Sequence, residues 1–294
     1  MIPDFRLPVS CEAQRLFHGR GHSEPGFEHV NIDWYKPLVL ITLYQEPVMG
    51  WLEQLSTWLM ATLAEAAVVA VQYRCRPMAP MEALVGELPA RLEVTEHGLN
   101  YELRLGQFQN TGLFLDMANG RRWVLEHGAG KRVLNLFAYT CGFSVAAIAG
   151  GAARVVNVDM SRRALAIGRD NHRLNQHQLD RVVFEGVDIF RSFGRLKKHG
   201  PYDLVIADPP TFQKGSVDIR KDYPRLLRRL PEMLAPGGEL LLCLNAPELG
   251  EHFLRQQVAT ECPDWRCIER LPNPDAFVEV DDTAGLKVLR YQSC

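Results

Sequence analysis

The chain has 294 residues, of which 47% are hydrophobic and 23% charged, and its formal net charge is −2. This length predicts about two domains, each large enough for a hydrophobic core, and the apolar fraction excludes a disordered or collagen-like chain. No apolar run reaches the roughly 18 residues that a membrane span needs, and the first six residues lack the features of a signal peptide. We therefore expect a globular protein without membrane segments.

The number and spacing of the seven cysteines indicate the redox compartment of the protein. Their number is odd and they form no Cys-x-x-Cys pair. A disulfide framework or a zinc module is therefore not expected, and reduced thiols in a cytoplasmic protein fit best. No feature of the sequence indicates an oligomeric state.

The net charge conceals a strong asymmetry along the chain. Residues 1–120 carry 8 basic against 14 acidic residues, residues 121–229 carry 20 against 10, and residues 230–294 carry 5 against 11. An acidic front of −6 and an acidic tail of −6 therefore flank a middle of +10. Such a basic segment favours a polyanionic partner, provided that the functional motifs fall within it.

The first 108 residues predict a small α+β domain behind an irregular arm. Residues 1–30 are rich in Gly, Pro and His and show no sustained period, so we expect an irregular N-terminal arm. Residues 31–108 are predicted to form the α+β domain. Its expected elements are a strand at 37–44, a helix that opens at Pro47, a strand at 67–73, and a hairpin of strands 91–95 and 99–105.

Residues 109–294 show a different pattern, in which strands alternate with helices. The apolar strands are expected at 133–137, 155–158, 182–184, 204–207 and 240–244, and helices at 161–175 and 222–234. Near-continuous apolar strands with intervening helices predict a parallel sheet that is covered on both faces. The expected fold is therefore α/β, a Rossmann-like doubly wound sheet preceded by a small α+β domain.

In such a sheet, ligands bind where the strands end, so the residues that follow each strand predict the ligand. The first strand leads into residues 135–144, where Gly142 is the only glycine, and this disfavours a dinucleotide. Asp159 ends the second strand and can accept hydrogen bonds from ribose hydroxyls. Asp188 and Ile189 follow the third strand and offer a carboxylate and an apolar side chain to an adenine ring.

The fourth strand is followed by Asp208-Pro209-Pro210-Thr211-Phe212. The two prolines fix the backbone and remove donors, so that carbonyls and Asp208 can face a substrate, while Phe212 offers a face to a flat base. Any one of these features alone is more often a helix cap or a change of chain direction. Their occurrence in order on consecutive strands indicates a nucleoside cofactor.

This order of motifs resembles the class I S-adenosylmethionine-dependent methyltransferases. The resemblance narrows at Thr111-Gly-Leu-Phe-Leu-Asp116, which Arg121 and Arg122 follow, and at the hairpin turn Glu96-His-Gly-Leu99. With Asp208-Pro-Pro-Thr-Phe212, these segments are similar to the bacterial large-subunit ribosomal RNA methyltransferases I and K, which methylate cytosine carbon-5 and guanine N7. The similarity covers about residues 90–250, and no PUA or THUMP domain is recognisable.

The resemblance implies S-adenosylmethionine as the cofactor, no metal, and a set of site residues. The residues expected to bind the cofactor are Phe114, Asp116, Arg122, Asn135, Phe137, Tyr139, Thr140, Gly142, Asp159, Met160, Asp188, Ile189 and Asp208. The residues expected at the reacting centre are Asp208, Pro209, Pro210 and Phe212. The implied partner is RNA, in particular ribosomal RNA, with its phosphates on the basic stretch 191–229, to which Tyr223 would belong.

The atom that accepts the methyl group depends on a cysteine. Methylation of cytosine carbon-5 needs a thiolate that adds to the ring. The position of that cysteine matches Asn245 here, and Cys243, two residues earlier amid leucines, is expected to be a packed core thiol. Asn245 and Thr211 look more like the guanine N7 enzymes, so we expect a nitrogen acceptor such as guanine N7. The alternatives are a cytosine carbon-5 RNA methyltransferase, a methyltransferase for a small molecule or a protein, and a non-enzymatic RNA-binding module.

Overall fold

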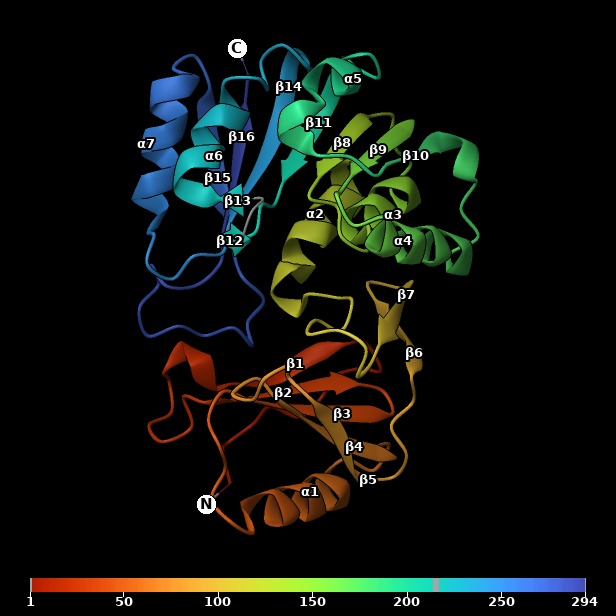
Figure 1. The fold of residues 1–294 in the computed structure, drawn as a ribbon, viewed down its shortest axis with the longest axis vertical. Coiled ribbons are helices and arrows are strands. Elements are labelled where there is room, and N and C mark those ends of the chain that lie inside the picture. Colours follow the sequence, from red (N-terminus) through yellow and green to blue (C-terminus); the bar gives the residue numbers. More distant parts are fainter. Residues whose placement is uncertain (1, 214–216, 294) are drawn as a thin grey trace. The chain divides into compact units, whose positions relative to one another are not determined.

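The computed structural model describes residues 2–213 and 217–293, and the chain divides into two compact units. The first unit comprises Met1–Leu115 with Pro274–Asp282, and the second comprises Asp116–Asn273 with Thr283–Cys294. Each unit contains its own main β-sheet (Figure 1). Each also has its own hydrophobic core.

The first unit is built on a five-stranded sheet in the order β1-β2-β3-β4-β5, beside a separate β6-β7 hairpin. β3 and β4 pair in parallel, and α1 forms the crossover between them, whereas the other neighbouring strands pair antiparallel. Leu55, Leu59 and Leu63 of the α1 region belong to the same buried cluster as the inward side chains of the sheet. The elements are β1 (Gln14–His18), η1 (Gly19–Gly21), β2 (Val30–Tyr35), β3 (Leu38–Leu43), α1 (Trp51–Thr62), β4 (Val68–Tyr73), β5 (Met81–Val85), β6 (Arg91–Glu96) and β7 (Leu99–Arg104).

The sequence pattern did not predict β1, β2 or β5, and it placed the start of the first helix too early. Residues 1–30, which were expected to be irregular, contain β1, whose pairing with β2 shifts between Arg15 and Phe17. An irregular register of this kind breaks the two-residue alternation by which a strand is recognised. The first helix begins at Trp51 and not at Pro47, because Gly50 precedes it with a φ of 77°.

The second unit is built on a seven-stranded sheet in the order β10-β9-β8-β11-β14-β16-β15. The strands are β8 (Arg132–Leu136), β9 (Arg154–Val158), β10 (Val182–Glu185), β11 (Tyr202–Ala207), β14 (Leu234–Leu244), β15 (Arg266–Leu271) and β16 (Lys287–Gln292), with a small pair of β12 (Phe212–Gln213) and β13 (Val217–Asp218). The helices are η2 (Leu115–Met117), α2 (Ala118–His127), α3 (Gly142–Ala149), α4 (Arg162–Leu174), η3 (Leu179–Arg181), η4 (Ile189–Arg191), α5 (Phe193–Lys197), α6 (Ile219–Leu227) and α7 (Glu251–Glu261).

The topology of this sheet fixes where a ligand can bind. The chain runs outward from β8 to β9 and β10, returns to β11 on the other side of β8, and then proceeds to β14. Crossovers between parallel strands are right-handed, so the helices of the two halves cover opposite faces of the sheet. The order of strands therefore reverses between β8 and β11, where ligands of doubly wound folds bind, beyond the carboxyl ends of the strands. Strand β16 is antiparallel to both of its neighbours, β14 and β15.

These findings confirm the expected fold class, a doubly wound α/β sheet preceded by a small α+β domain. The expected helix at 222–234 differs from the observed one, because α6 begins at Ile219 and ends at Leu227, and Leu234 already belongs to β14. The side chain of Asp218 accepts a hydrogen bond from the backbone N–H of Arg220 at 3.1 Å and so caps the helix three residues earlier than expected.

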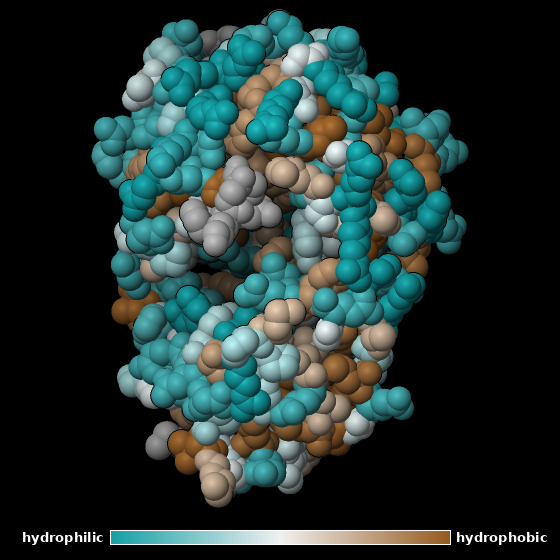
Figure 2. Space-filling view, viewed as in Figure 1, coloured by the Kyte–Doolittle hydropathy of each residue, from teal (hydrophilic) through white to brown (hydrophobic). Residues whose placement is uncertain are grey.

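On the face shown in Figure 2, hydrophilic residues cover most of the surface and hydrophobic ones lie in small groups. Among the described residues, no helix combines the length and the apolar character that a membrane crossing requires.

Candidate functional site

The loop between β8 and α3 has an unusual backbone. Phe137, Tyr139 and Cys141 have φ values of 58°, 45° and 62°, in the left-handed region that residues other than glycine rarely adopt. Such residues each cost about 1–3 kcal/mol and persist only where the surrounding structure holds them. Backbone hydrogen bonds contribute to this restraint, since Ala138 N–H donates to Val158 O at 3.0 Å and Cys141 N–H donates to Ala138 O at 2.7 Å. The strained loop lies at the switch point, where a ligand is expected.

Asp159 connects this loop to the loop that follows β9. One carboxylate oxygen accepts the backbone N–H of Tyr139 at 2.9 Å, and the other accepts the N–H of Ser161 at 2.7 Å. Burial raises the pKa of the Asp159 carboxyl, and these two hydrogen bonds oppose that rise. Each oxygen has a second lone pair, so the carboxylate can still accept hydrogen bonds from ribose hydroxyls. Met160, the next residue, is exposed.

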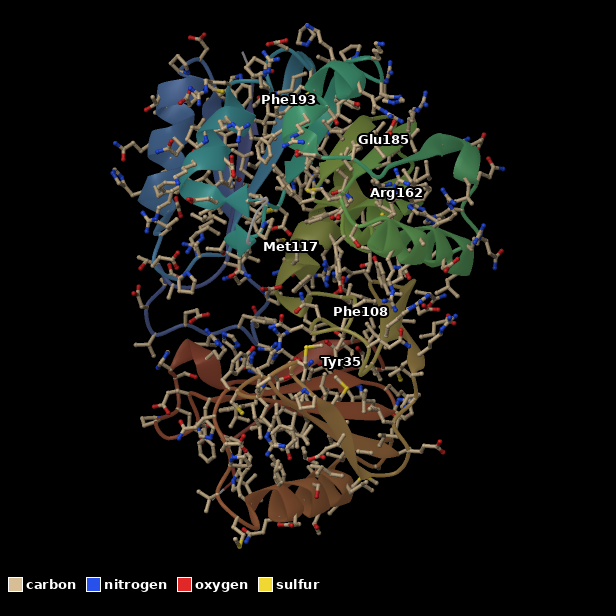
Figure 3. All side chains as sticks on the ribbon, viewed as in Figure 1. Tyr35, Phe108, Met117, Arg162, Glu185 and Phe193 are labelled. Atoms are coloured by element: carbon tan, nitrogen blue, oxygen red, sulfur yellow. The ribbon has the colours of Figure 1, made fainter. Side chains whose placement is uncertain are left out.

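Asp188 lies in the loop that follows β10. One of its carboxylate oxygens accepts the backbone N–H of Phe190 at 2.8 Å and so caps η4, and the other lies 3.4 Å from Arg191 Nε. The carboxylate that was predicted to bind an adenine amino group thus also fixes its own loop. Gly186, at the start of this loop, lies against α4, because a Cβ there would come within 2.7 Å of Arg162 Cγ. Figure 3 labels Arg162 beside Glu185, the last residue of β10.

Apolar side chains line the same edge of the sheet. Ile189 is buried, and the rings of Phe137 and Phe190 are half-buried with their centroids 6.3 Å apart. A flat adenine ring is well suited to such surroundings. Phe190 was not among the predicted site residues, although its position next to Ile189 could have indicated it.

A second cluster lies beyond β11 and consists of charged groups. The pKa of Asp208 is raised to about 7, mainly by burial and further by the negative charge of Asp116, and the positive charge of Arg121 opposes the rise. Asn245, at the end of β14, donates from its side-chain amide to Asp116 Oδ2 at 3.5 Å. Thr211 Oγ1 donates to the carbonyl of Asn245. The ends of β11 and β14 are therefore linked around two carboxylates.

Arg121 lies near Asp208 and was not among the predicted site residues. It is buried, and its Cδ would lie 3.3 Å from a Cβ at Gly142, so it packs between the strained loop and the second cluster. Arg122, which was selected instead, is exposed on α2. Phe114 is 42% exposed and belongs to the first unit, whereas Asp116 and Arg122 belong to the second.

The segment after Asp208 is described only in part. Pro209 is buried and Pro210 is exposed. The backbone of Phe212 pairs with that of Asp218, but the side chain of Phe212 and residues 214–216 lie outside the described part of the chain. The predicted stacking of a base on Phe212 stays a prediction.

Cys243 is a core thiol. It is fully buried on β14, and burial raises the pKa of its thiol well above the ordinary value. The hydroxyl of Tyr223 donates to the carbonyl of Cys243 at 3.0 Å, and Tyr223 is itself only 1% exposed. The expectation that Tyr223 belongs to a basic surface was therefore wrong, because its side chain is on the buried face of α6.

The basic stretch 191–229 is extensively paired with carboxylates. The described pairs are Arg191–Asp188, Arg195–Glu185, Lys197–Glu232, Lys221–Asp218, Arg225–Asp222, Arg228–Glu261 and Arg229–Glu232. All seven cations are exposed. In the pairs with Asp188, Asp218 and Glu232 the carboxylate is accessible as well, and such pairs contribute about 1 kcal/mol or less, so these cations can exchange carboxylate for phosphate. Within residues 2–213 and 217–293, no group of three or more His, Cys, Asp or Glu side chains could hold a metal ion.

The residues of the second unit fit a nucleoside cofactor. A held loop with left-handed residues follows β8, a carboxylate with free acceptor capacity follows β9, and an apolar face with a carboxylate follows β10. This arrangement defines a cofactor site of the Rossmann-like class, with a cluster of polar and charged groups beyond it.

The comparisons with known proteins define the family. The model of the S-adenosylmethionine-dependent methyltransferase family matches residues 14–292, so the chain belongs to that family. The crystal structure of SMU.776 complexed with SAH superimposes with a TM-score of 0.87 at 28% identity, over 96% of this chain and 75% of that one. The cofactor of this chain is therefore S-adenosylmethionine, as the motifs predicted.

Two curated relatives show higher identity over shorter stretches. Ribosomal RNA large subunit methyltransferase I of Serratia proteamaculans is 32% identical over 240 residues, which are 78% of this chain and 60% of that protein. Ribosomal RNA large subunit methyltransferase K/L of Shewanella sp. (strain MR-4) is 39% identical over 166 residues, which are 54% of this chain and 23% of that protein. The chain thus matches only part of the length of both relatives.

Proposed function

We propose that this protein transfers the methyl group of S-adenosylmethionine to a base of RNA, in particular ribosomal RNA, with a nitrogen acceptor such as guanine N7. The observation that carries the proposal is the cluster of Asp208, Asp116 and Asn245 beyond the strained loop. Both curated relatives are named as ribosomal RNA methyltransferases, which supports an RNA substrate.

The cofactor would be held by the loops that follow β8, β9 and β10. The backbone from Asn135 to Gly142 would follow the methionine part, Asp159 would bind the ribose hydroxyls, and Asp188 with Ile189 would bind the adenine. The bound cofactor supplies a methyl group on a positively charged sulfur. The role of the chain is to hold the acceptor in line with that methyl group, which is a matter of position and orientation.

The second cluster suits a nitrogen acceptor. A ring nitrogen already has a lone pair and needs no covalent activation, in contrast to cytosine carbon-5. Methylation at guanine N7 leaves a positive charge on the purine, and carboxylates at Asp208 and Asp116 would stabilise that charge. The burial of Cys243 and the raised pKa of its thiol disfavour a thiolate mechanism.

The phosphates of the RNA would contact the exposed cations of residues 191–229, in exchange for their carboxylate partners. A cytoplasmic location is part of this proposal, and it is supported by the six described cysteines, all of which are free.

The test is a methyl-transfer assay with labelled S-adenosylmethionine and total RNA from cells that lack the protein. We expect label that nuclease removes and protease leaves in place, and transfer that weakens steeply with salt because several phosphates are bound. Label in protein or in the low-molecular-weight fraction would establish the rival substrates. Label that stays on the cofactor while RNA binds would establish a non-enzymatic module.

A further inference from the structure

A chain of buried polar side chains lies beneath the strained loop. Asn135 Nδ2 donates to Asn157 Oδ1 at 2.9 Å, and Asn157 Nδ2 donates to Ser144 Oγ at 2.9 Å. Ser144 Oγ lies 2.9 Å from His172 Nε2, and His172 Nδ1 lies 3.0 Å from Nδ1 of His177. This series of hydrogen bonds therefore connects β8, β9, α3 and α4. Its first four side chains are at most 2% exposed.

The side chains of this buried hydrogen-bonded series are uncharged at neutral pH. Burial lowers the pKa of His172 to about 3 and also lowers the pKa of His177. Because the two Nδ1 atoms face each other at hydrogen-bond distance, one carries a hydrogen and the other accepts it. Buried polar groups are costly unless they are hydrogen-bonded, and apolar side chains could fill the same volume. A complete polar chain at this place therefore indicates a role in fixing a particular geometry.

Two members of the buried hydrogen-bonded series lie on either side of the strained loop in the sequence. Asn135 lies two residues before Phe137, the first residue with a left-handed backbone, and Ser144 lies three residues after Cys141, the last one. The bonds of both to Asn157 on β9 hold the two ends of the loop at a fixed separation.

Helix α4 holds the middle of the loop. Asn171 Nδ2 donates to the carbonyl of Thr140 at 2.9 Å. One turn earlier, a Cβ at Gly168 would come within 2.3 Å of Cys141 Sγ and 3.2 Å of the carbonyl carbon of Thr140. Glycine in the interior of a helix is unfavourable relative to alanine. Its presence here is explained by the close approach of the loop, which no larger residue allows.

We propose that Gly168 and Asn171, together with the buried chain Asn135–Asn157–Ser144–His172, are positioning residues that hold the loop from Phe137 to Gly142 ready for S-adenosylmethionine. They contact the loop from α4 and from the sheet and keep it ordered, so that ordering the loop costs little free energy when the cofactor binds. This inference concerns the cofactor alone and does not depend on which acceptor is methylated.

The first test is Asn171→Ala, with Asn175→Ala as the matched control. Asn175 follows the last residue of α4, and its amide donates to the carbonyl of Asn171 at 2.8 Å, so the control removes an amide hydrogen bond to the end of the helix. Titration calorimetry should show that Asn171→Ala binds S-adenosylmethionine about five- to twentyfold more weakly, as expected from loss of a buried hydrogen bond. At saturating cofactor, kcat should stay within about twofold of the wild type. Asn175→Ala should keep the wild-type Kd, even if its Tm is equally lowered.

The second test measures the loop without cofactor. Hydrogen exchange of the amides of residues 138–142 should accelerate in Asn171→Ala and not in Asn175→Ala. A wild-type Kd for Asn171→Ala, or the same change of Kd in both variants, would overturn the proposal. If Asn171→Ala does not fold, Ser144→Ala removes one hydroxyl from the chain with little change of volume. A Kd and exchange rates for Ser144→Ala equal to those of the wild type would then reject it.

Discussion

The two halves of the sheet edge in the second unit are built on different principles. Beyond β8, β9 and β10, hydrogen bonds to Tyr139 and Thr140 and a neutral buried chain hold a strained backbone in place. Beyond β11 and β14, the interacting groups are the carboxylates of Asp208 and Asp116 near Arg121. The first half fixes a shape, whereas the second presents charge.

This difference indicates a division of labour that experiments can separate. Substitutions in the first half should change cofactor affinity, because they release a preset geometry. Substitutions in the second half should change the rate of transfer and its dependence on pH, because electrostatic stabilisation acts on the charge that develops in the reaction.

The largest effect is expected from Asp208→Asn, which keeps the shape of the side chain and removes its charge. The single-turnover rate of methyl transfer should fall on the order of 10²-fold, and the Kd for S-adenosylmethionine should change much less. Asp203→Asn is the matched control, since Asp203 is at the opposite end of β11, the strand that Asp208 follows, and accepts the backbone N–H of Arg132 at 2.8 Å. If the Asp208→Asn variant transfers methyl groups at the wild-type rate, the charged groups beyond β11 and β14 do not act in the transfer step.

The second largest effect is expected in the loops that follow β8, β9 and β10. Asp159→Ala releases the backbone N–H groups of Tyr139 and Ser161 and removes the predicted ribose ligand. Calorimetry should show a Kd for S-adenosylmethionine raised by at least about tenfold. Asp170→Ala, whose carboxylate pairs with Arg173 on α4, should leave the Kd unchanged. If Asp159→Ala binds as tightly as the wild type, the ribose assignment is wrong.

The pH dependence should separate the two halves further. The pKa of Asp208 is raised to about 7, and the ionised carboxylate is the form that stabilises positive charge, so the transfer rate should rise with pH through about 7 and then level off. A raised carboxyl pKa also means that the folded state holds this proton where the unfolded state has lost it. The contribution of Asp208 to stability should therefore fall as pH rises from its ordinary pKa to about 7.

Activity profiles and melting curves, measured for the wild type and for Asp208→Asn, check both statements. The variant should lack both pH-dependent changes. If the transfer rate of both proteins rises with pH through about 7, a group other than Asp208 causes that rise.

The smallest effect is expected from Cys243→Ala. Because the thiol is buried and its pKa is raised, its loss should leave the transfer rate within about twofold and lower stability only modestly. A loss of activity greater than about 10²-fold, measured on folded protein, would instead support the cytosine carbon-5 mechanism.

Much of this arrangement was predictable from the sequence because it rests on local signals. The apolar runs predicted the parallel sheet, and the topology brings the residues after β8, β9, β10 and β11 to one edge. The supporting residues were not predictable in the same way. Gly168 and His172 are on a helix, and only packing against the loop reveals why they are glycine and neutral histidine. The choice between Arg121 and Arg122 likewise depends on the rotation of α2, which adjacent residues do not reveal.

The central claim, methyl transfer to a base nitrogen of RNA, is tested most directly by identifying the methylated nucleoside. RNA labelled by the protein with S-adenosylmethionine is digested to nucleosides and analysed by mass spectrometry. We predict 7-methylguanosine as the labelled nucleoside. Label in 5-methylcytidine, or no label in RNA, would contradict the account.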